Sequence, residues 1–401
     1  MFFERQFPYI FLCCIISNTY GKRKITGEHR MKHETGKNKK IRTELILSCC
    51  LFLLAFLAKT AAGRSSAFAN WYSHRIYRFF SFLFTFADGH IPFSITEIGL
   101  YCLLLFILSD FIRSLLKRKP LFFFLHLLLI GSVLFFLYIF NCGINYHRSS
   151  FSQESGFTVQ AHSEEDMKNL CTYLVKEINT AEAGLSVEGS PVIGQDESME
   201  KPDFAYLLQA GRTGSLAMQK LGGSYPGLSG SYPYPKPLLI SRILSVQQLT
   251  GVYSPFTIEA NYNREIAYYD IPFTICHELS HLKGYMQEEE ANFISFLACT
   301  GSDDLYYRYS GLVSGWVYAG NALAAADPDA FAALYGSLNE NTKKDLSYNN
   351  RFWKRFEGKI AETSDQVNDH YLKMNGQTEG VKSYGHVVDL MLTWYSRETA
   401  G

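Results

Sequence analysis

The sequence has no net charge, few histidines and no cysteine pattern that would support a small disulfide-stabilised domain. Lys and Arg together number 38, and Asp and Glu also number 38, so the formal net charge is zero. A balanced chain gives no electrostatic reason to expect nucleic acid as a partner. Because only 11 of the 401 residues are histidine, a short motif that contains two of them is informative.

The nine cysteines match neither a disulfide framework nor a zinc ribbon. Six of them lie in or near apolar runs within the first 145 positions, where cysteine commonly serves as a small apolar side chain. The other three, Cys171, Cys276 and Cys299, are widely spaced, so at most one pair could form a bridge. Cys276 precedes His277 directly, but adjacent side chains on a helix point about 100° apart, and we interpret Cys276 as a packing residue.

Long apolar runs are abundant in the first 145 residues. Three segments, at about 43–62, 98–116 and 121–140, approach the roughly 20 residues that a helix needs to cross a bilayer. The third has no formal charge, whereas Lys59 and Asp110 would have to lie at the interface. The sequence therefore predicts a three-helix transmembrane anchor within residues 43–141 and a lipid bilayer as partner. From its length, the second segment is also compatible with a buried soluble helix.

Basic clusters predict the orientation of this anchor. One cluster precedes the first span, and another separates the second span from the third: Lys37, Lys39, Lys40 and Arg42, then Arg113, Lys117, Arg118 and Lys119. Such clusters stay in the cytoplasm, which places residues 142–401 outside it, although Arg64, Arg75 and Arg78 oppose this orientation. The amphipathic, aromatic loop Trp71–Phe93 is expected to lie along the outer interface. Residues 1–42 form a basic leader, with Met31 as an alternative start.

The polar half of the chain predicts an α+β, mostly helical domain. Apolar residues at helical spacing favour helices over Ser163–Thr180 and Phe204–Leu221. Two short runs, Pro237–Ile243 and Gly251–Asn261, are typical of strands. The second contains Pro255, which suits an edge strand that could pair with an extended substrate.

The most informative motif is His277-Glu278-Leu279-Ser280-His281. Positions i and i+4 share one helix face, so both imidazoles can reach a single ion while Glu278 holds a water beside it. This is the HExxH arrangement of zinc hydrolases, in which zinc acidifies the water and the glutamate takes its proton. Asp270 is a reasonable N-cap for this helix, and Gly284 is placed to end it.

A third zinc ligand is expected from the acidic run that follows. Glu288 is our choice, because Glu288-x-x-Ala291-Asn292 resembles the signature of zinc peptidases that use a glutamate ligand. In that signature the small Ala permits close helix packing, and Asn292 would orient a ligand histidine. Glu290 remains an alternative, since helix phase alone does not separate the two. A tight chain reversal at Gly284 is needed in either case.

Several stretches together resemble a family of bacterial membrane proteins, domain of unknown function 3810. They include WYSHRIYRFFSFLFTF, GINYHR, GVYSPFTIEANYN, PFTICHELSHLKGYMQEEEANFISFLAC and YLKMNGQTEGVKSYGHVVDL, over about residues 43–394. The resemblance implies a three-span anchor and a zincin-like metallopeptidase domain. Together with the orientation expected from the basic clusters, it predicts an extracytoplasmic domain on the bacterial inner membrane. It also directs attention to Tyr384 as a weak candidate for oxyanion stabilisation.

The sequence thus predicts a membrane-anchored zinc metallopeptidase that acts on a peptide or protein. Zn²⁺ would be bound by His277, His281 and Glu288, with Glu278 as the general base. Two alternatives remain: a noncatalytic envelope protein with a structural metal site or a partner-binding domain, and a cell-wall amidase. A closed four-ligand site would favour the noncatalytic protein, and an open coordination position would favour catalysis.

Overall fold

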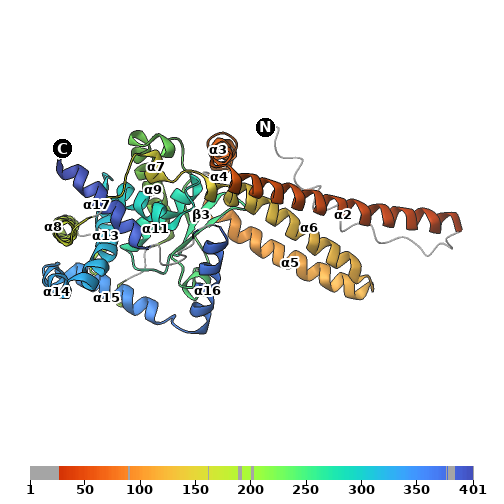
Figure 1. The fold of residues 1–401 in the computed structure, drawn as a ribbon. Helices are drawn as coiled ribbons and strands as arrows, with labels where there is room; N and C mark the ends of the chain where they lie inside the picture. The colour runs from red at the N-terminus through yellow and green to blue at the C-terminus, as the bar shows by residue number, and fades with distance from the viewer. Residues whose placement is uncertain are drawn as a thin grey trace, which may run out of the picture.

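The computed structural model describes residues 27–88, 91–160, 162–187, 192–199, 203–375, 377 and 384–400; within these ranges, the side chains of residues 27–37, 87, 88, 384, 385 and 400 are not described. Most of these residues are helical, as the sequence predicts. Residues 1–26 of the basic leader lie outside the described part, and the Met31 alternative stays a prediction. Three long helices project from one side of a broader, mixed domain (Figure 1).

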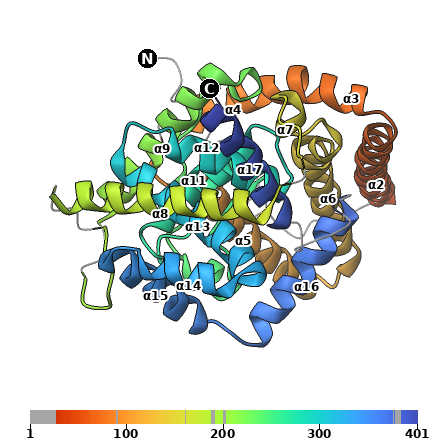
Figure 2. The ribbon, with the colours of Figure 1, turned by 60° about the vertical axis from the view of Figure 1, so that its left-hand side comes forward.

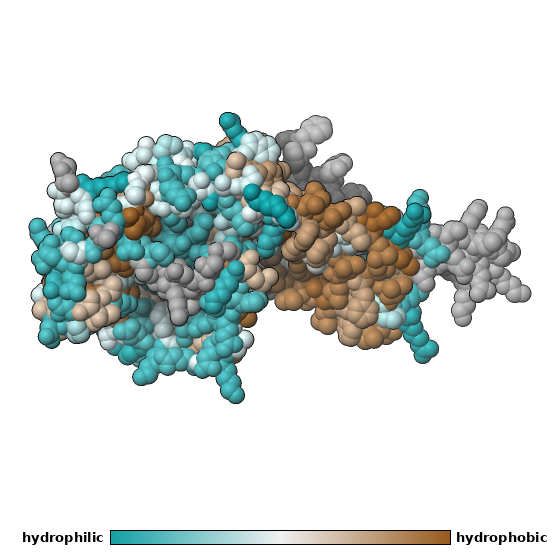
Figure 3. Space-filling model, viewed as in Figure 1, coloured by the Kyte–Doolittle hydropathy of each residue, from teal (hydrophilic) through white to brown (hydrophobic). Residues whose placement is uncertain are grey.

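The projecting helices are α2 (Gly27–Arg64), α5 (Ile95–Leu116) and α6 (Pro120–Tyr138). Each contains a stretch long and apolar enough to cross a membrane, which confirms the three predicted apolar segments. Their surface is strongly apolar, whereas the domain surface is largely polar (Figure 3). Helix α6 continues through two short turns, η2 (Ile139–Gly143) and η3 (Asn145–His147), into the domain.

The aromatic segment between the first two candidate spans is helical rather than a loop. It forms α3 (Ser66–Trp71), a π-helical stretch η1 (Tyr72–Tyr77) and α4 (Arg78–Asp88). Tyr77 at the end of η1 and Ser81 of α4 both donate to the carbonyl of Leu282 in the domain, while the phenylalanines of α4 are exposed. An amphipathic pattern was therefore predicted, but its helical period was missed.

The domain is built from helices around a small sheet. Helix α13 packs against α8, α11 and α12, and α8 lies across the front of this group in Figure 2. The helices predicted at 163–180 and 204–221 are present, as α8 and α9. The domain helices and 3₁₀ turn are α7 (Phe151–Glu154), α8 (Glu164–Val187), α9 (Phe204–Ser224), η4 (Pro226–Leu228), α10 (Arg242–Ser245), α11 (Asp270–Leu282), α12 (Glu288–Thr300), α13 (Leu305–Ala326), α14 (Pro328–Gly336), α15 (Glu340–Lys354), α16 (Lys359–Met374) and α17 (Tyr384–Ala400).

The sheet has three short strands in the order β1-β3-β2, formed by Lys236–Pro237, Glu259–Tyr262 and Gly251–Ser254. Strand β1 is parallel to β3 and β2 is antiparallel to it. The predicted strand at 237–243 is wrong beyond Pro237, since the chain turns there and enters α10. The predicted strand at 251–261 is instead a hairpin, reversed where Ile258 has φ 50°.

Buried carboxylates fix the sheet to the domain-side end of α5. Glu259 of β3 accepts hydrogen bonds from the main-chain N–H groups of Ile95 and Thr96, at 3.0 and 2.7 Å. These are orphan donors at a helix N-terminus, where a carboxylate is favoured. Glu97 in turn accepts from the N–H groups of Leu239 and Ile240. The sheet and this candidate span are therefore held together by charge-assisted bonds.

Candidate metal centre

Helix α11 carries the HExxH motif on a nearly fully buried element. It begins at Asp270, with Tyr269 rather than Asp270 as the N-cap, so the predicted cap is one residue too late. Gly284 ends the helix with φ +89°, a left-handed conformation that favours glycine. The N–H of Tyr285 then returns to the carbonyl of Ser280 at 3.2 Å. This reversal brings the start of α12 back beside α11.

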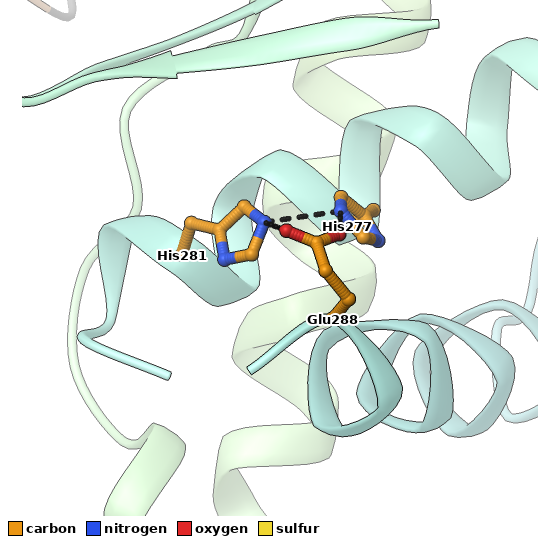
Figure 4. Close-up of side chains that lie close together, drawn as sticks. All are labelled: His277, His281 and Glu288. Carbon is orange, nitrogen blue, oxygen red and sulfur yellow. Dashed lines mark hydrogen bonds and ion pairs between the residues drawn. The ribbon is translucent and has the colours of Figure 1, made fainter. Parts of the chain in front are cut away.

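The side chains of His277, His281 and Glu288 converge between these two helices (Figure 4). The two Nε2 atoms lie 3.0 Å apart. The Glu288 carboxylate lies 3.2 Å from His277 Nε2 and 3.6 Å from His281 Nε2. Within the described part of the chain, this is the single group of three or more candidate ligands whose donor atoms approach one another within 4.8 Å.

The donor set fits a zinc ion in both chemistry and spacing. Zinc binds imidazole nitrogen and carboxylate oxygen at about 2.0–2.2 Å in tetrahedral geometry, which separates neighbouring donors by roughly 3.3–3.5 Å. The three separations of 3.0, 3.2 and 3.6 Å bracket that value. Three protein ligands leave one tetrahedral position open, as in catalytic rather than structural zinc sites.

The outer nitrogen of each histidine has a separate partner that orients its ring. His277 Nδ1 lies 2.8 Å from Asn292 Oδ1, and His281 Nδ1 lies 2.8 Å from the carbonyl oxygen of Tyr285. Both acceptors require the proton on Nδ1, which leaves the Nε2 lone pair free for a metal. Asn292 therefore lies where the sequence pattern suggested, next to a predicted ligand.

Burial and mutual contact shift the pKa values in the metal-free site. Burial alone would lower the pKa of His277, but the adjacent Glu288 carboxylate raises it to about 9. Burial lowers the pKa of His281 to about 4. Although burial opposes ionisation of Glu288, the neighbouring His281 and His277 lower its pKa to about 2. Without a metal, a proton therefore resides on His277 and pairs it with Glu288.

Glu278 lies beside this group and beneath the edge strand β2. Its side chain is buried, and burial raises its pKa to about 8, while the main-chain N–H of Tyr253 donates to the carboxylate and partly offsets this rise. A Cβ atom at Gly251 would lie 2.5 Å from Glu278 Oε1 and 2.8 Å from Thr274 Cγ2. Glycine at 251 therefore lets the strand approach the carboxylate. Sequence reasoning missed Gly251, because its importance depends on this contact.

Glu289 and Glu290, the two acids that follow Glu288, bind other residues. Glu290 accepts from the N–H and hydroxyl of Ser152, at 2.9 and 2.5 Å, and is buried away from the histidines. Glu289 accepts from Gln377. The structure thus brings Glu288, and not the alternative Glu290, to the histidine pair.

Two tyrosines of α13 have partners other than the histidine pair and Glu288. Tyr307 and Tyr309 are buried and donate their hydroxyl groups to the Ala210 carbonyl and to Asp345. Tyr384 begins α17, but its side chain lies outside the described part of the structure. Its role in oxyanion stabilisation therefore stays a prediction.

Comparison with protein families gives one result. The model of the family described as proteins of unknown function, DUF3810, matches residues 72–392, which include the candidate spans α5 and α6 and the metal centre. No curated protein and no solved structure matches the chain. The match covers most of the sequence, and the chain belongs to the DUF3810 family.

Proposed function

We propose that this protein is a membrane-anchored, zinc-dependent metallopeptidase with a zincin-like catalytic domain. The observation that carries the proposal is the convergence of two imidazole nitrogens and one carboxylate at tetrahedral spacing beside a buried glutamate. A bound zinc ion would acidify water and polarise a carbonyl at the open position. His277, His281 and Glu288 would hold the ion.

Glu278 has the position and environment of a general base. Burial raises its pKa towards neutrality, where a carboxylate accepts and returns protons most effectively. In the proposed reaction Glu278 takes a proton from water as the oxygen attacks the amide carbon. It then gives that proton to the nitrogen as the C–N bond breaks, producing a carboxylic acid and an amine.

The edge strand β2 supplies a binding surface for an extended peptide. It lies at the end of the sheet order β1-β3-β2, so one side of its backbone is not paired within the described sheet. Addition of a substrate strand to a sheet edge is a common mode of peptide recognition. Because Gly251 has no side chain, this edge can lie directly beside Glu278. A peptide paired with the edge would then have its scissile bond near the base.

The positions of the two basic clusters on the anchor indicate on which side of the membrane the domain would lie. The first cluster lies at the start of the candidate span Asn38–Arg64 of α2, and the second lies where α5 leads into α6. Both clusters are therefore remote from the domain (Figure 1). By the positive-inside rule the domain would lie outside the cytoplasm, on a bacterial inner membrane.

Metal analysis and hydrolysis assays on the full-length protein in detergent test the proposal. We expect one zinc per chain and cleavage within a soluble peptide library. The Glu278→Gln variant should keep the zinc and lose at least about 100-fold in rate, as expected for removal of a general base. Undiminished cleavage by this variant, or a folded protein that binds no zinc, would contradict the proposal.

A further inference from the structure

We propose that the substrate is a membrane-anchored polypeptide, cut within about ten residues of the bilayer surface on the domain's side. This inference rests on the proposed peptidase function and adds where the scissile bond lies. Two sets of observations carry it: contacts that tie the metal centre to the ends of the candidate spans, and exposed apolar side chains around those ends.

The domain-side membrane boundary can be located on α5. Its 22 residues span about 33 Å at 1.5 Å per residue, close to the thickness of the hydrocarbon core. Ile95 at its N-terminus therefore lies at the boundary. Glu97, two residues further, holds the N–H groups of Leu239 and Ile240, so this segment of the domain lies at the same depth.

Apolar side chains are exposed on the domain around this boundary. Leu239, Ile240 and Ile243 are 43%, 48% and 47% exposed, and Phe256 at the hairpin tip is 42% exposed. We call these four residues the membrane seat. The carbonyl of Pro255, beside Phe256, accepts from Nδ2 of Asn141 at 2.7 Å, and Asn141 lies in η2, which continues α6. Each part of the seat is thus bonded to the end of a candidate span.

Two amphipathic helices extend this apolar surface. Helix α16 exposes Ile360, Val367 and Met374 at seven-residue spacing, and Asn375 just after it accepts from the Tyr138 hydroxyl of α6. In Figure 1, α16 runs across the direction of the spans. Helix α4 exposes several phenylalanines in the same way: Phe79, Phe80, Phe82, Phe84 and Phe86. Because these surfaces adjoin the spans, lipid is the occupant that covers them.

The metal centre is held near this surface by direct contacts. The Tyr253 hydroxyl of β2 donates to the carbonyl of Asn141 at 3.1 Å, and it also contacts the Tyr77 hydroxyl at 2.9 Å. Tyr77 donates to the carbonyl of Leu282, one residue after His281. The edge strand and the end of the metal-binding helix are therefore fixed to η2, which continues α6, and to η1, which precedes α4.

The β2–β3 hairpin extends from the proposed catalytic base, Glu278, to the membrane seat, so its length gives the distance between them. Gly251 at the start of β2 touches Glu278, while Phe256 lies at the tip in the membrane seat. Five residues of extended chain cover at most about 17 Å at 3.3 Å per residue. A substrate strand lying along β2 reaches the bilayer after about five residues, so a juxtamembrane stretch of an anchored polypeptide fits this geometry.

Mapping cleavage positions tests the inference without a known substrate. The probe is a pool of peptides, each with a 30-residue randomised segment joined to one hydrophobic span. The pool and full-length protein are placed in the same vesicles, and a soluble library with the same randomised segment is added to separate vesicles. We expect cuts in the anchored pool to cluster within about ten residues of the boundary. The Glu278→Gln variant controls for contaminating proteases.

The possible outcomes separate the two proposals. Cuts spread evenly along the anchored segment, or cleavage of the soluble library alone, would overturn the membrane inference and leave the peptidase function standing. Absence of Glu278-dependent cleavage in both libraries would instead overturn the peptidase function.

An independent measurement tests the membrane seat without catalysis. A fluorescent amino acid at position 243 should be quenched at least twofold more by bromine-labelled lipid chains than one at Val187. Val187 is 90% exposed at the end of α8, which lies on the side of the domain remote from the spans in Figure 1. Equal quenching at both positions would place the seat in water and overturn the inference.

Substitutions in the seat connect the two measurements. The pair Ile240→Asp with Ile243→Asp should reduce cleavage of the anchored pool about tenfold and leave zinc content and soluble-library cleavage unchanged. Val187→Asp is the matched control and should change neither. Retention of anchored-pool cleavage by the pair would contradict the role of the seat.

Discussion

The protein has two clusters of histidine and carboxylate side chains, one in the domain and one among the candidate spans, and their geometries differ. In the domain, the Nε2 atoms of His277 and His281 face Glu288 from one side. Among the candidate spans, His126 of α6 lies between Asp110 of α5 and Glu44 of α2, with its two nitrogens 2.9 and 3.7 Å from their carboxylates.

The difference lies in where the nitrogens point. In the domain cluster an amide or carbonyl oxygen binds each outer Nδ1, so two Nε2 lone pairs converge on one place. In the span cluster both nitrogens of a single histidine face separate acids, and no converging set of donors remains. The first arrangement can hold a metal. The second joins three helices through charge in an apolar surrounding, where polar side chains are usually paired.

Removal of a domain histidine should have the largest effect. We expect His281→Ala to weaken zinc binding about several hundredfold, because roughly 10–16 kcal/mol of binding free energy in a structural site is shared among four donors. Competition with a chromogenic chelator measures the affinity. His126→Ala is the control and should keep the zinc, and equal loss in both variants would abolish the distinction between the clusters.

Removal of Asn292, which accepts the hydrogen bond from His277 Nδ1, should weaken zinc binding less than removal of a histidine ligand. Asn292→Ala leaves all three donors in place but no longer orients the His277 ring, and such outer partners commonly contribute 10–100-fold to metal affinity. We expect a loss of that size in the chelator assay. Asn292→Asp keeps an acceptor oxygen and should retain most of the affinity. An unchanged affinity for Asn292→Ala would show that packing alone fixes the ring.

Apolar length and helix periodicity predicted the three candidate spans and the helices α8 and α9, and the HExxH spacing placed both histidines on one face of α11. The helices α13–α17 were not predicted. The sequence left Glu288 and Glu290 unresolved, because the choice depends on how the Gly284 turn sets the phase of α12. It also depends on Ser152, more than 130 positions away, which binds Glu290. Neither the phase of α12 nor the Ser152–Glu290 hydrogen bonds can be recognised from neighbouring residues in the sequence.

The failed strand prediction at 237–243 has a physical reason. Its apolar residues resemble a buried strand, but Leu239 and Ile240 are exposed, and their N–H groups bind Glu97 instead of a neighbouring strand. Sequence periodicity does not distinguish an apolar side chain that faces a protein core from one that faces lipid. The Gly251 contact was missed for a related reason, since it depends on the approach of a distant helix.

Metal binding in the domain cluster should depend on pH. The Glu288 carboxylate raises the pKa of His277 to about 9, and a metal needs the neutral ring. Below that pH the neutral fraction falls tenfold per unit, so apparent zinc affinity should weaken about tenfold for each unit from pH 8 to pH 6. Calorimetry in buffers of different ionisation enthalpy should detect release of about one proton. A pH-independent affinity would contradict the protonated His277–Glu288 pair.

The smallest effect is expected in the span cluster. His126→Leu leaves Asp110 and Glu44 without their shared partner among apolar helices. Polar contacts between membrane helices average about 0.6 kcal/mol and reach about 1.7 kcal/mol, so we expect the free energy of unfolding to fall by about 1 kcal/mol. Reversible unfolding of the full-length protein in mixed micelles measures this change. The triple replacement of Glu44, Asp110 and His126 by Leu should recover the loss, because no polar group of the cluster then remains unpaired. Lys40, the other partner of Glu44, is 58% exposed and stays solvated. If His126→Leu is neutral and zinc binding is unaffected, the span cluster contributes no stability, and only its geometry distinguishes it from the metal centre.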